Sequence, residues 1–383
     1  MLNFQFYNPT RIVFGKDTVK QLSKYIPHNA RVLLLYGGQS AVKNGTLSEV
    51  KNALGDIYHE EFAGIEPNPR YETLMKAVAQ VKTNKLDFLL AVGGGSVIDG
   101  TKFVAQAALY SDDPWKILTR QGAKVTQALP LATVLTIPAT GSEMNCSGVI
   151  TKAETQEKLP FRNELIFPQF SIMDPTKTYT LPVRQLENGL VDAFIHVIEQ
   201  YLTYSVDAKI PDYFAEGVMR TLIEIAPDVI NKPDDYNARA NFMWAATMAL
   251  NGILATGVPQ DWATHLIGHE LTALYGVDHA RTLAMILPVL WRIKKDEKKD
   301  KLLQYAQRVW NITQGSDDER IMQAIAKTQQ FFESLGMKMS LAQYGVEKDI
   351  DLIIQRLEQH GLTALGERKS VTIDISRQIL QSI

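Results

Sequence analysis

Strand and helix patterns alternate through the first 175 residues, and they restrict the fold more than any other feature of the chain. Continuous apolar runs at 31–36, 87–92 and 132–137 each end in a turn rich in glycine or small hydroxyl residues. Runs without a polar face are typical of parallel strands buried on both sides of a sheet. Helical patterns separate the runs, at 46–54, 70–84 and 97–109. The sequence therefore predicts a doubly wound α/β domain with a parallel sheet.

Strand patterns largely disappear after Asp174-Pro175. Helical patterns follow one another instead, at 184–204, 212–230, 236–256, 261–275, 280–292, 299–311 and 317–335. The first of them is apolar almost all round, as expected of a buried helix. We expect two domains, an α/β domain over residues 1–181 and an all-helical domain over residues 182–383.

The composition is that of an ordinary soluble globular protein, with 45% apolar and 21% charged residues among 383. A net charge of −2 without a long basic tract argues against nucleic acid or an anionic membrane surface as a partner. No stretch approaches the roughly 18 apolar residues of a membrane span. Cys146 is the only cysteine, so a reducing cytoplasm is the expected location. The charged run at 294–301 mixes both signs and is interpreted as a solvated helix face.

Three of the seven histidines fall within fifteen residues of the second half of the chain. His265 and His269 stand four apart, so both project from one face of a helix. Gly276 suits the end of that helix, which places His279 past a turn, at the start of the next one. Upstream, Asp192 and His196 lie one turn apart in the apolar helix, where each is costly to bury without a partner.

These residues admit a structural and a metal-binding interpretation. A lone buried histidine is usually a hydrogen-bonded core residue, and an Asp–His pair four residues apart can be structural too. A divalent metal would satisfy the carboxylate and the imidazole together, with one or two further histidines from 265–279, and we favour it. His269-Glu270 begins like the zinc-protease pattern His-Glu-x-x-His, but Ala273 stands where the second histidine is required, which excludes that pattern.

Gly93-Gly94-Gly95-Ser96 joins a buried strand to a helix. Free N–H groups and the positive end of a helix dipole meet there, as a phosphate requires. The motif is not the Rossmann G-x-G-x-x-G, and a triple glycine can also be only a tight turn. A second loop, Thr136 to Glu143, adds hydroxyl groups at another strand's carboxyl end, the edge where open α/β sheets bind ligands. Two such loops favour a dinucleotide.

The end of the first strand indicates which dinucleotide. NAD sites commonly place an Asp or Glu there to hold the ribose hydroxyls. Here Gly37-Gly38-Gln39-Ser40 follows, with Lys43 close behind and no acid among them. Small residues, a hydroxyl and a lysine would accommodate the 2′-phosphate that an acid would repel. We therefore predict NADP(H), bound in part by Gly37, Gly38, Ser40 and Lys43.

Together these motifs resemble those of the iron-containing (group III) alcohol dehydrogenase family. The resemblance runs over essentially the whole chain, and it is greatest to the NADPH-dependent, butanol-dehydrogenase-type aldehyde reductases of that family. Its motifs stand at 9–15, 66–69, 93–99 and 140–143, with the segments around Asp192 and His265.

The resemblance implies one divalent metal, Zn²⁺ or Fe²⁺, held by Asp192, His196, His265 and His279. It implies that His269 is a non-ligand histidine near the nicotinamide. The implied cofactor positions are Asn68, Gly94, Gly95, Ser96, Thr136, Thr140 and Lys158, with Gly37 at the position that discriminates NAD from NADP. Asp99, which ends the glycine motif, and Ser147, where many members have asparagine, complete the predicted cofactor set. Ala280 departs from the glycine of many members.

The implied reaction is reversible hydride transfer between NADP(H) and an aldehyde and its primary alcohol, in a cleft between the domains. The metal would act as a Lewis acid on the carbonyl oxygen, while the hydride chemistry belongs to the cofactor. His269 is our candidate for relaying the alcohol proton through water; the alternative is a packing role. Family resemblance also suggests a homodimer.

Alternatives from other classes stay open. A metal-dependent hydrolase would activate water and use the glycine loops as turns. A non-catalytic nucleotide-binding protein would bind NADPH and tolerate loss of the metal ligands. Within the same fold, relatives of glycerol dehydrogenase and dehydroquinate synthase are further alternatives. Oxidation of NADPH by butanal would separate a reductase from a hydrolase.

Overall fold

The computed structural model of the chain describes residues 1–119 and 124–383. Contacts within the chain divide it into two compact units. The sheet unit comprises Tyr7–Pro182 and Asn231–Thr247, and the helical unit comprises Met1–Phe6, Val183–Ile230 and Met248–Ile383. The expected fold class, an α/β domain with a parallel sheet followed by a helical domain, is confirmed.

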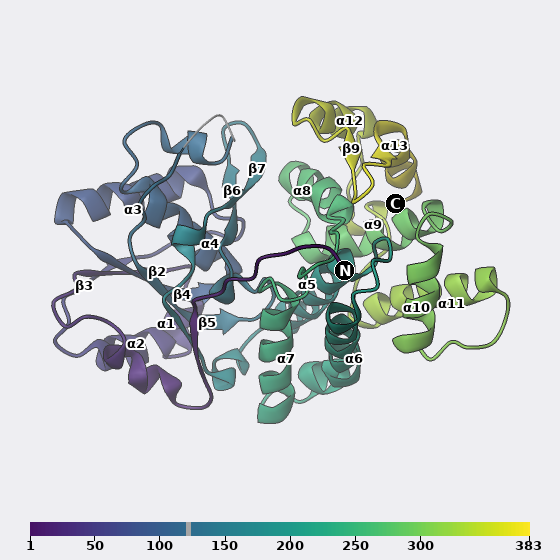
Figure 1. Ribbon diagram of the computed structural model, residues 1–383. Helices are drawn as coiled ribbons and strands as arrows, with labels where there is room; N and C mark the ends of the chain where they lie inside the picture. Colours follow the sequence, from purple (N-terminus) through teal and green to yellow (C-terminus); the bar gives the residue numbers. More distant parts are fainter. Residues whose placement is uncertain (120–123) are drawn as a thin grey trace. The chain divides into compact units, whose positions relative to one another are not determined.

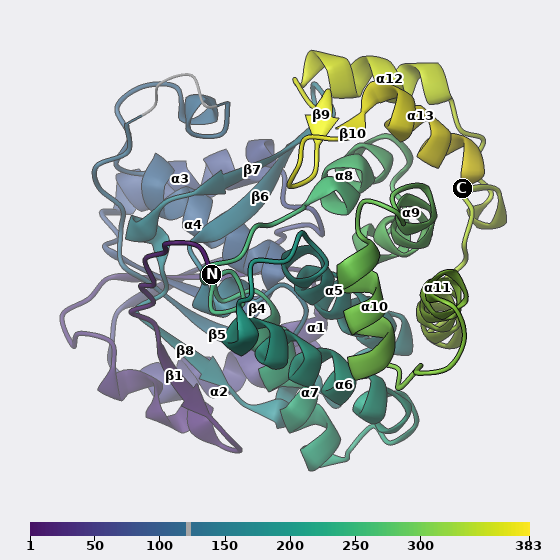
Figure 2. The ribbon, with the colours of Figure 1, turned by 45° about the vertical axis from the view of Figure 1, so that its right-hand side comes forward.

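The sheet unit is built on six parallel strands in the order β1-β8-β5-β4-β2-β3, which are labelled between Figures 1 and 2. Their bounds are β1 (Arg11–Phe14), β2 (Val32–Tyr36), β3 (His59–Phe62), β4 (Phe88–Gly94), β5 (Leu131–Ile137) and β8 (Phe170–Met173). The three apolar runs of the sequence are β2, β4 and β5, which lie next to one another. All three are almost wholly buried, as the missing polar face predicts.

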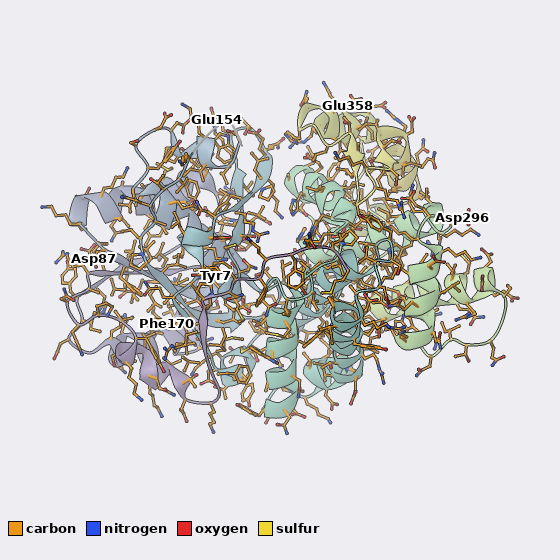
Figure 3. The ribbon with its side chains drawn as sticks, in the orientation of Figure 1. Tyr7, Asp87, Glu154, Phe170, Asp296 and Glu358 are labelled. Carbon is orange, nitrogen blue, oxygen red and sulfur yellow. The ribbon has the colours of Figure 1, made fainter. Side chains whose placement is uncertain are left out.

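Successive residues of the strands point to opposite faces of the sheet and into two separate cores. On one face, Leu33 of β2 packs with α3 (Tyr71–Asn84) and α4 (Gly95–Ala107). On the other face, Leu34 packs with α2 (Thr46–Leu54) and η1 (Thr18–Lys24). Figure 1 shows α3 and α2 on opposite sides of the strands. The second core includes Phe170, labelled in Figure 3 at the start of β8. The doubly wound arrangement therefore follows from residue alternation along the strands.

An antiparallel hairpin, β6 (Ser147–Lys152) and β7 (Glu157–Arg162), was not predicted from the sequence. It packs on α4, and Figure 2 shows it beside that helix. Its strands are only partly buried, so they lack the continuous apolar run that marks β2, β4 and β5. Short elements complete the unit: α1 (Ser40–Lys43), η2 (Pro114–Ile117), η3 (Ser142–Met144), η4 (Glu164–Ile166), η5 (Pro175–Thr178) and most of α7 (Tyr236–Ala249).

The helical unit contains α5 (Val183–Tyr201), α6 (Lys209–Asn231), α8 (Ala263–Tyr275), α9 (His279–Ile293), α10 (Lys299–Arg308), α11 (Asp317–Ser334), η6 (Ala342–Tyr344), α12 (Ile350–Gln359) and α13 (Ile373–Ser382). A small hairpin of β9 (Ala364–Leu365) and β10 (Val371–Thr372) joins the last two helices. The pattern predicted over 236–256 ends earlier, at Ala249, and Gly252, with φ +94°, cannot belong to a helix. Helix α9 packs against both α5 and α8, and Figures 1 and 2 both show α8 and α9 side by side.

The charged run at 294–301 is only in part the solvated face that its composition suggested. Asp296, labelled in Figure 3, is exposed, but Lys298 is 3% exposed and Lys301 is 5% exposed. Lys298 donates to the carboxylates of Asp261 (2.6 Å) and Glu367 (3.0 Å), so burial there is compensated by two acids distant in sequence. No helix among the described residues has both the length and the apolar composition of a membrane span.

Candidate metal centre and dinucleotide loops

Helix α5 carries the first part of the candidate metal centre. Its C-terminal half is buried on all sides, and Asp192, His196 and Glu199 lie three or four residues apart within it. Spacing of this kind places the three side chains along one face. Asp192 and His196 are each 5% exposed and Glu199 is 2% exposed. Two acids and an imidazole are therefore held inside an apolar helix, where each requires a partner.

Helices α8 and α9 carry the second part, and the turn between them behaves as predicted. Gly276 ends α8 with φ +66°, a left-handed conformation that glycine adopts without strain. The chain then reverses, and His279 becomes the first residue of α9. Its ring centroid lies 5.2 Å from that of His265 and 4.9 Å from that of His269. His279, fourteen residues beyond His265 in the sequence, therefore lies next to His265 in the structure.

Asp192, His265 and His279 each offer one ligand atom, and these atoms all lie within 4.8 Å of one another. Oδ1 of Asp192 has no hydrogen-bond partner among the residues that the structure describes. It lies 3.8 Å from Nε2 of His196 and 3.9 Å from Nε2 of His265. Tetrahedral ligand atoms roughly 2.1 Å from a metal stand about 3.4 Å apart. The three ligand atoms therefore fit a divalent cation if they move slightly closer to one another.

The other two predicted histidines border this set. His196 is not one of its three members, but its ring stacks on that of His265 at 4.7 Å and an interplanar angle of 20°. His269 is 8% exposed, and its ring centroid is 6.3 Å from that of His265. Trp262, which sequence reasoning did not single out, places its indole 5.3 Å from His265. The helical unit thus gathers all five predicted residues and adds an aromatic neighbour.

Glu199 lies along the same face of α5 as Asp192 and His196, but the sequence did not show its role. Its carboxylate accepts a hydrogen bond from Nδ1 of His265 and another from the backbone N–H of Thr264 (2.7 Å). With Glu199 ionised, Nδ1 of His265 is the donor in this contact and carries the proton, which leaves Nε2 as the nitrogen that faces Asp192. Burial and the nearby Asp261 carboxylate raise the pKa of Glu199 to about 8.

The two predicted loops of the sheet unit touch each other. Gly94 is the N-cap of α4, so the glycine turn stands at the start of that helix as expected. A Cβ atom at Gly95 would lie 2.5 Å from Oγ1 of Thr140, and one at Gly94 would lie 2.8 Å from Cβ of Ile137. Only glycine therefore lets the loop after β5 approach the loop after β4 so closely. Thr136, the first residue of the second loop as predicted from the sequence, lies within β5.

Asn68 and the residues after β2 lie around the same edge. The backbone N–H of Asn68 donates to Oγ of Ser96 at 3.3 Å. Gly37 packs closely, since its Cβ would lie 3.1 Å from the carbonyl oxygen of Ile65, whereas Gly38 faces open space. Ser40 begins α1 and Lys43 ends it. Parallel strands bring their carboxyl ends to one edge, so these residues share it with the glycine loops.

Asp99 lies where α4 contacts the β6–β7 hairpin, which carries Ser147 on β6 and Lys158 on β7. Oδ1 of Asp99 accepts from Oγ of Ser142 at 2.6 Å, and Oδ2 accepts from the backbone N–H of Val149 at 3.0 Å. Burial raises the pKa of Asp99, and the positive charges of Lys102 and Lys158 oppose that shift. Ser147 begins β6 and accepts a hydrogen bond from Lys102 through its carbonyl oxygen. Lys102 was missed because a lysine in a helix is normally read as solvent-exposed.

Comparison with known proteins identifies the family. The sequence profile of the family described as iron-containing alcohol dehydrogenase matches residues 9–175, and that of the Fe-containing alcohol dehydrogenase family, C-terminal, matches residues 188–372. The chain belongs to the iron-containing alcohol dehydrogenase family. The expected resemblance is thus confirmed, and the chain is an oxidoreductase. Membership of this family gives no support to the metal-dependent hydrolase.

Individual members are similar over the full length of this iron-containing alcohol dehydrogenase. The NADPH-dependent aldehyde reductase YqhD of Escherichia coli (strain K12) is 55% identical, with all of both chains covered. Its crystal structure superposes with a TM-score of 0.98, covering 99% of this chain and 98% of that one. The probable NADH-dependent butanol dehydrogenase 1 of Bacillus subtilis (strain 168) is 40% identical, also with full coverage. A relative named as NADPH-dependent and a relative named as NADH-dependent are therefore both similar to this chain over its full length.

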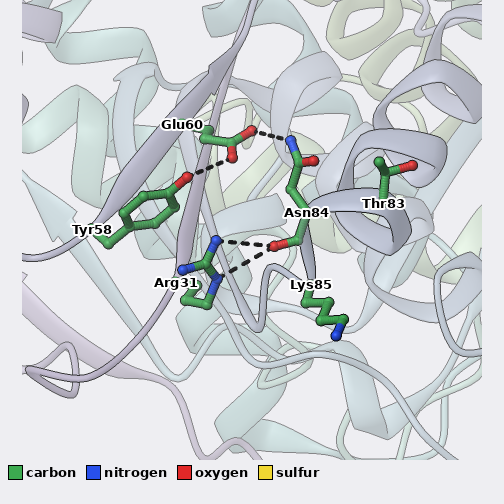
Figure 4. A pocket seen from close by; sticks show the side chains of 6 residues that line it. All are labelled: Arg31, Tyr58, Glu60, Thr83, Asn84 and Lys85. Carbon is green, nitrogen blue, oxygen red and sulfur yellow. Dashed lines mark hydrogen bonds between the residues drawn. The ribbon is translucent and has the colours of Figure 1, made fainter.

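A hollow of about 520 Å³ in the sheet unit lies away from the glycine loops (Figure 4). Arg31 precedes β2 and Asn84 ends α3, so the hollow opens at the amino ends of the strands. Arg31 donates to the carbonyl oxygen of Asn84, and the carboxylate of Glu60 accepts from both Tyr58 and the Asn84 amide. These lining groups satisfy one another, and we assign no ligand to this hollow.

Proposed function

We propose that this protein reduces aldehydes to primary alcohols with NADPH and catalyses the reverse reaction. The observation that carries the proposal is the metal-ligand cluster of Asp192, His265 and His279 in a member of the iron-containing alcohol dehydrogenase family. The 55% identity to a relative named as an NADPH-dependent aldehyde reductase supports the substrate class. Glycerol-dehydrogenase-like chemistry is the alternative within the same fold.

Asp192, His196, His265 and His279 would hold Zn²⁺ or Fe²⁺. When bound, the metal supplies Lewis acidity toward the carbonyl oxygen of the substrate. Asp192 provides the negative charge of the donor set, and its burial keeps water from competing for that position. Glu199 would orient His265 by accepting a hydrogen bond from its Nδ1. Each of these roles rests on side chains that α5, α8 and α9 already bring together.

His269 would relay the proton of the alcohol through water. Its ring lies 4.9 Å from that of His279, next to the ligand cluster but outside it. An imidazole gains and loses a proton near neutral pH, as a relay requires. The alternative is that His269 packs beside the ligands without a chemical role.

Residues 1–181 would bind the dinucleotide, and residues 182–383 would hold the metal. Gly37, Gly38, Ser40 and Lys43 would receive the 2′-phosphate, because no acid follows β2 and Gly38 leaves open space. The other proposed cofactor contacts are Asn68, Gly94, Gly95, Ser96, Asp99, Thr136, Thr140, Ser147 and Lys158. The N-terminus of α4 would stabilise the negative charge of the phosphates.

The protein would work as a cytoplasmic homodimer. β1 is an edge strand of the sheet, and apolar side chains near it are exposed, with Tyr7 at 61% and Phe14 at 38%. Exposed edges and aromatic residues of this kind favour association with a second copy. The single cysteine, Cys146, is buried and reduced, in keeping with a cytoplasmic location.

The decisive experiment measures NADPH oxidation on adding butanal to metal-loaded protein, with NADH in parallel and elemental analysis of the same sample. We expect loss of the reduced-nicotinamide absorbance with NADPH at a higher kcat/KM than with NADH. The sample should contain close to one zinc or iron per chain. A metal-loaded protein that binds NADPH yet oxidises none of it with any aldehyde of a panel would overturn the proposal.

A further inference from the structure

Lys102 is a fully buried lysine in the middle of α4, at 0% exposure. A buried ammonium is costly unless each of its protons has an acceptor. Nζ of Lys102 donates to Oγ of Ser142 (2.9 Å), to Oδ1 of Asn145 (2.9 Å) and to the carbonyl oxygen of Ser147 (2.8 Å). Three acceptors use all three protons of an ammonium, whereas a neutral amine has only two. Lys102 is therefore held as a cation, although burial lowers its pKa to about 8.

Asp99 supplies the opposite charge from one turn earlier on the same helix. Ser142 lies between the two groups: its hydroxyl accepts from Lys102 and donates to Oδ1 of Asp99 at 2.6 Å. Asp99 is within the first turns of α4, where a phosphate would bind, so its charge alone would repel the cofactor. The ammonium of Lys102 offsets that charge from inside the protein.

All three acceptors of Lys102 belong to one short segment, residues 142–147, which follows β5 and ends at the first residue of β6. Thr140, just before this segment, packs against Gly95 of the glycine loop. Ser147 ends the segment and is a proposed cofactor contact. Lys102 thus joins the helix that starts at the glycine loop to the segment that carries the second set of cofactor positions.

Stability alone does not explain a lysine at this position. Replacing a whole buried pair of charges, such as Asp99 and Lys102, by apolar groups of the same volume is often neutral or stabilising, whereas removing only one of the two is costly. An apolar group could not, however, hold two side-chain oxygens and one backbone oxygen in a defined arrangement. The contribution of the ammonium is therefore the geometry of the segment.

We propose that Lys102 is a positioning residue for the dinucleotide, which holds segment 142–147 against the glycine loop and so sets the affinity for NADPH. This inference rests on the proposed function, because it takes NADPH as the ligand of these loops. Lys102 does not itself touch the reacting atoms; it acts through Ser142, Asn145 and Ser147.

The test compares Lys102→Met with the natural protein by titrating NADPH into each and following nicotinamide fluorescence without aldehyde. We expect the Kd for NADPH to rise by at least about tenfold, which corresponds to roughly 1.4 kcal/mol. Metal content should be unchanged, and the KM for butanal should change less than about twofold. Lys102→Arg retains the charge and should recover part of the affinity.

Lys301→Met is the matched control. Lys301 is also a buried lysine, but it donates to Asp212 within the helical unit. Its loss should lower the melting temperature and leave the NADPH Kd unchanged. A folded Lys102→Met protein that binds NADPH as tightly as the natural one would overturn the inference.

Ser142→Ala decides the question if Lys102→Met does not fold. It removes the hydroxyl between Lys102 and Asp99 and leaves the lysine in place, and we expect a several-fold weaker NADPH Kd. An unchanged Kd in that variant would overturn the inference. Failure of the proposed function would look different, since the natural protein itself would then fail to bind NADPH or to reduce butanal.

Discussion

At the scale of single residues, the candidate site depends on a few buried polar atoms whose partners come from distant parts of the chain. Spacing alone made Asp192, His196 and the histidines at 265–279 candidate ligands, because acids and histidines at helical spacing in apolar surroundings are rare and costly. The family resemblance supplied the proposed set of four ligands. The sequence did not identify Lys102 or the role of Glu199. Their significance lies in what they contact, and no spacing rule shows that Lys102 meets residues forty positions away.

His265→Ala should abolish aldehyde reduction and lower the metal content of the purified protein. Removing one ligand from a buried cation leaves a poorly held, open coordination position. Elemental analysis and NADPH oxidation measure the two effects. His269→Ala is the control, which should keep its metal and lose rate only. Full metal occupancy in His265→Ala would contradict the ligand assignment.

Gly38→Asp should shift cofactor preference from NADPH toward NADH. A Cβ at Gly38 meets nothing within 4 Å, so this substitution tests charge with little steric effect, whereas one at Gly37 would lie 3.1 Å from the Ile65 carbonyl oxygen. The new carboxylate would repel the 2′-phosphate, and we expect the KM for NADPH to rise about tenfold, roughly 1.4 kcal/mol.

Gly38→Asn separates the charge from the shape of the new side chain. It should leave the NADPH/NADH ratio much closer to that of the natural protein. Added salt should partly relieve the effect of the aspartate, since repulsion at an exposed loop is screened. Equal weakening of both cofactors by Gly38→Asp would show that the loop is only a turn.

At the scale of elements, the sequence was most informative where hydrophobic periodicity and helix-ending residues agree. Helix α2 has the predicted bounds, and the turn at Gly276 between α8 and α9 is where its glycine indicated. The β6–β7 hairpin escaped prediction because it is partly buried and carries no continuous apolar run. Lys298 was assigned to a solvated face because charge patterning cannot show that Asp261 and Glu367 surround it.

Glu199→Gln should weaken metal binding without removing a ligand. Glu199 stands on α5 and accepts hydrogen bonds from the first turn of α8, at Thr264 and His265, so it links two ligand-bearing helices. Glutamine offers one acceptor oxygen in place of the two that receive hydrogen bonds from Thr264 and His265, so one of these two contacts is lost. We expect a loss of about 10–100-fold in metal affinity, measured by competition with a chromophoric chelator. Unchanged affinity would mean that α8 positions His265 unaided.

At the scale of the whole molecule, the metal and the dinucleotide are assigned to different compact units, and each ligand should stabilise the elements that hold it. A ligand present at about 100 times its Kd stabilises the native state by roughly 2.7 kcal/mol. The ligand-bearing helices are α5, α8 and α9, and the dinucleotide elements are α4 and the loops after β2, β4 and β5. Removing each ligand separately therefore tests both assignments at once.

Hydrogen exchange of the natural protein, read peptide by peptide, makes this test concrete. Chelation of the metal should speed exchange in peptides from α5, α8 and the start of α9, because the Asp192 carboxylate then loses the cation that balances its burial. NADPH should slow exchange at the start of α4 and across 136–147. Lys102→Met is the matched variant. In it, a higher NADPH concentration than in the natural protein should be needed to slow exchange across 136–147. If metal removal left hydrogen exchange in α8 unchanged, the assignment of the metal to the helices would be contradicted. If NADPH slowed exchange only in α8 and α9, the assignment of the dinucleotide to the sheet edge would be contradicted.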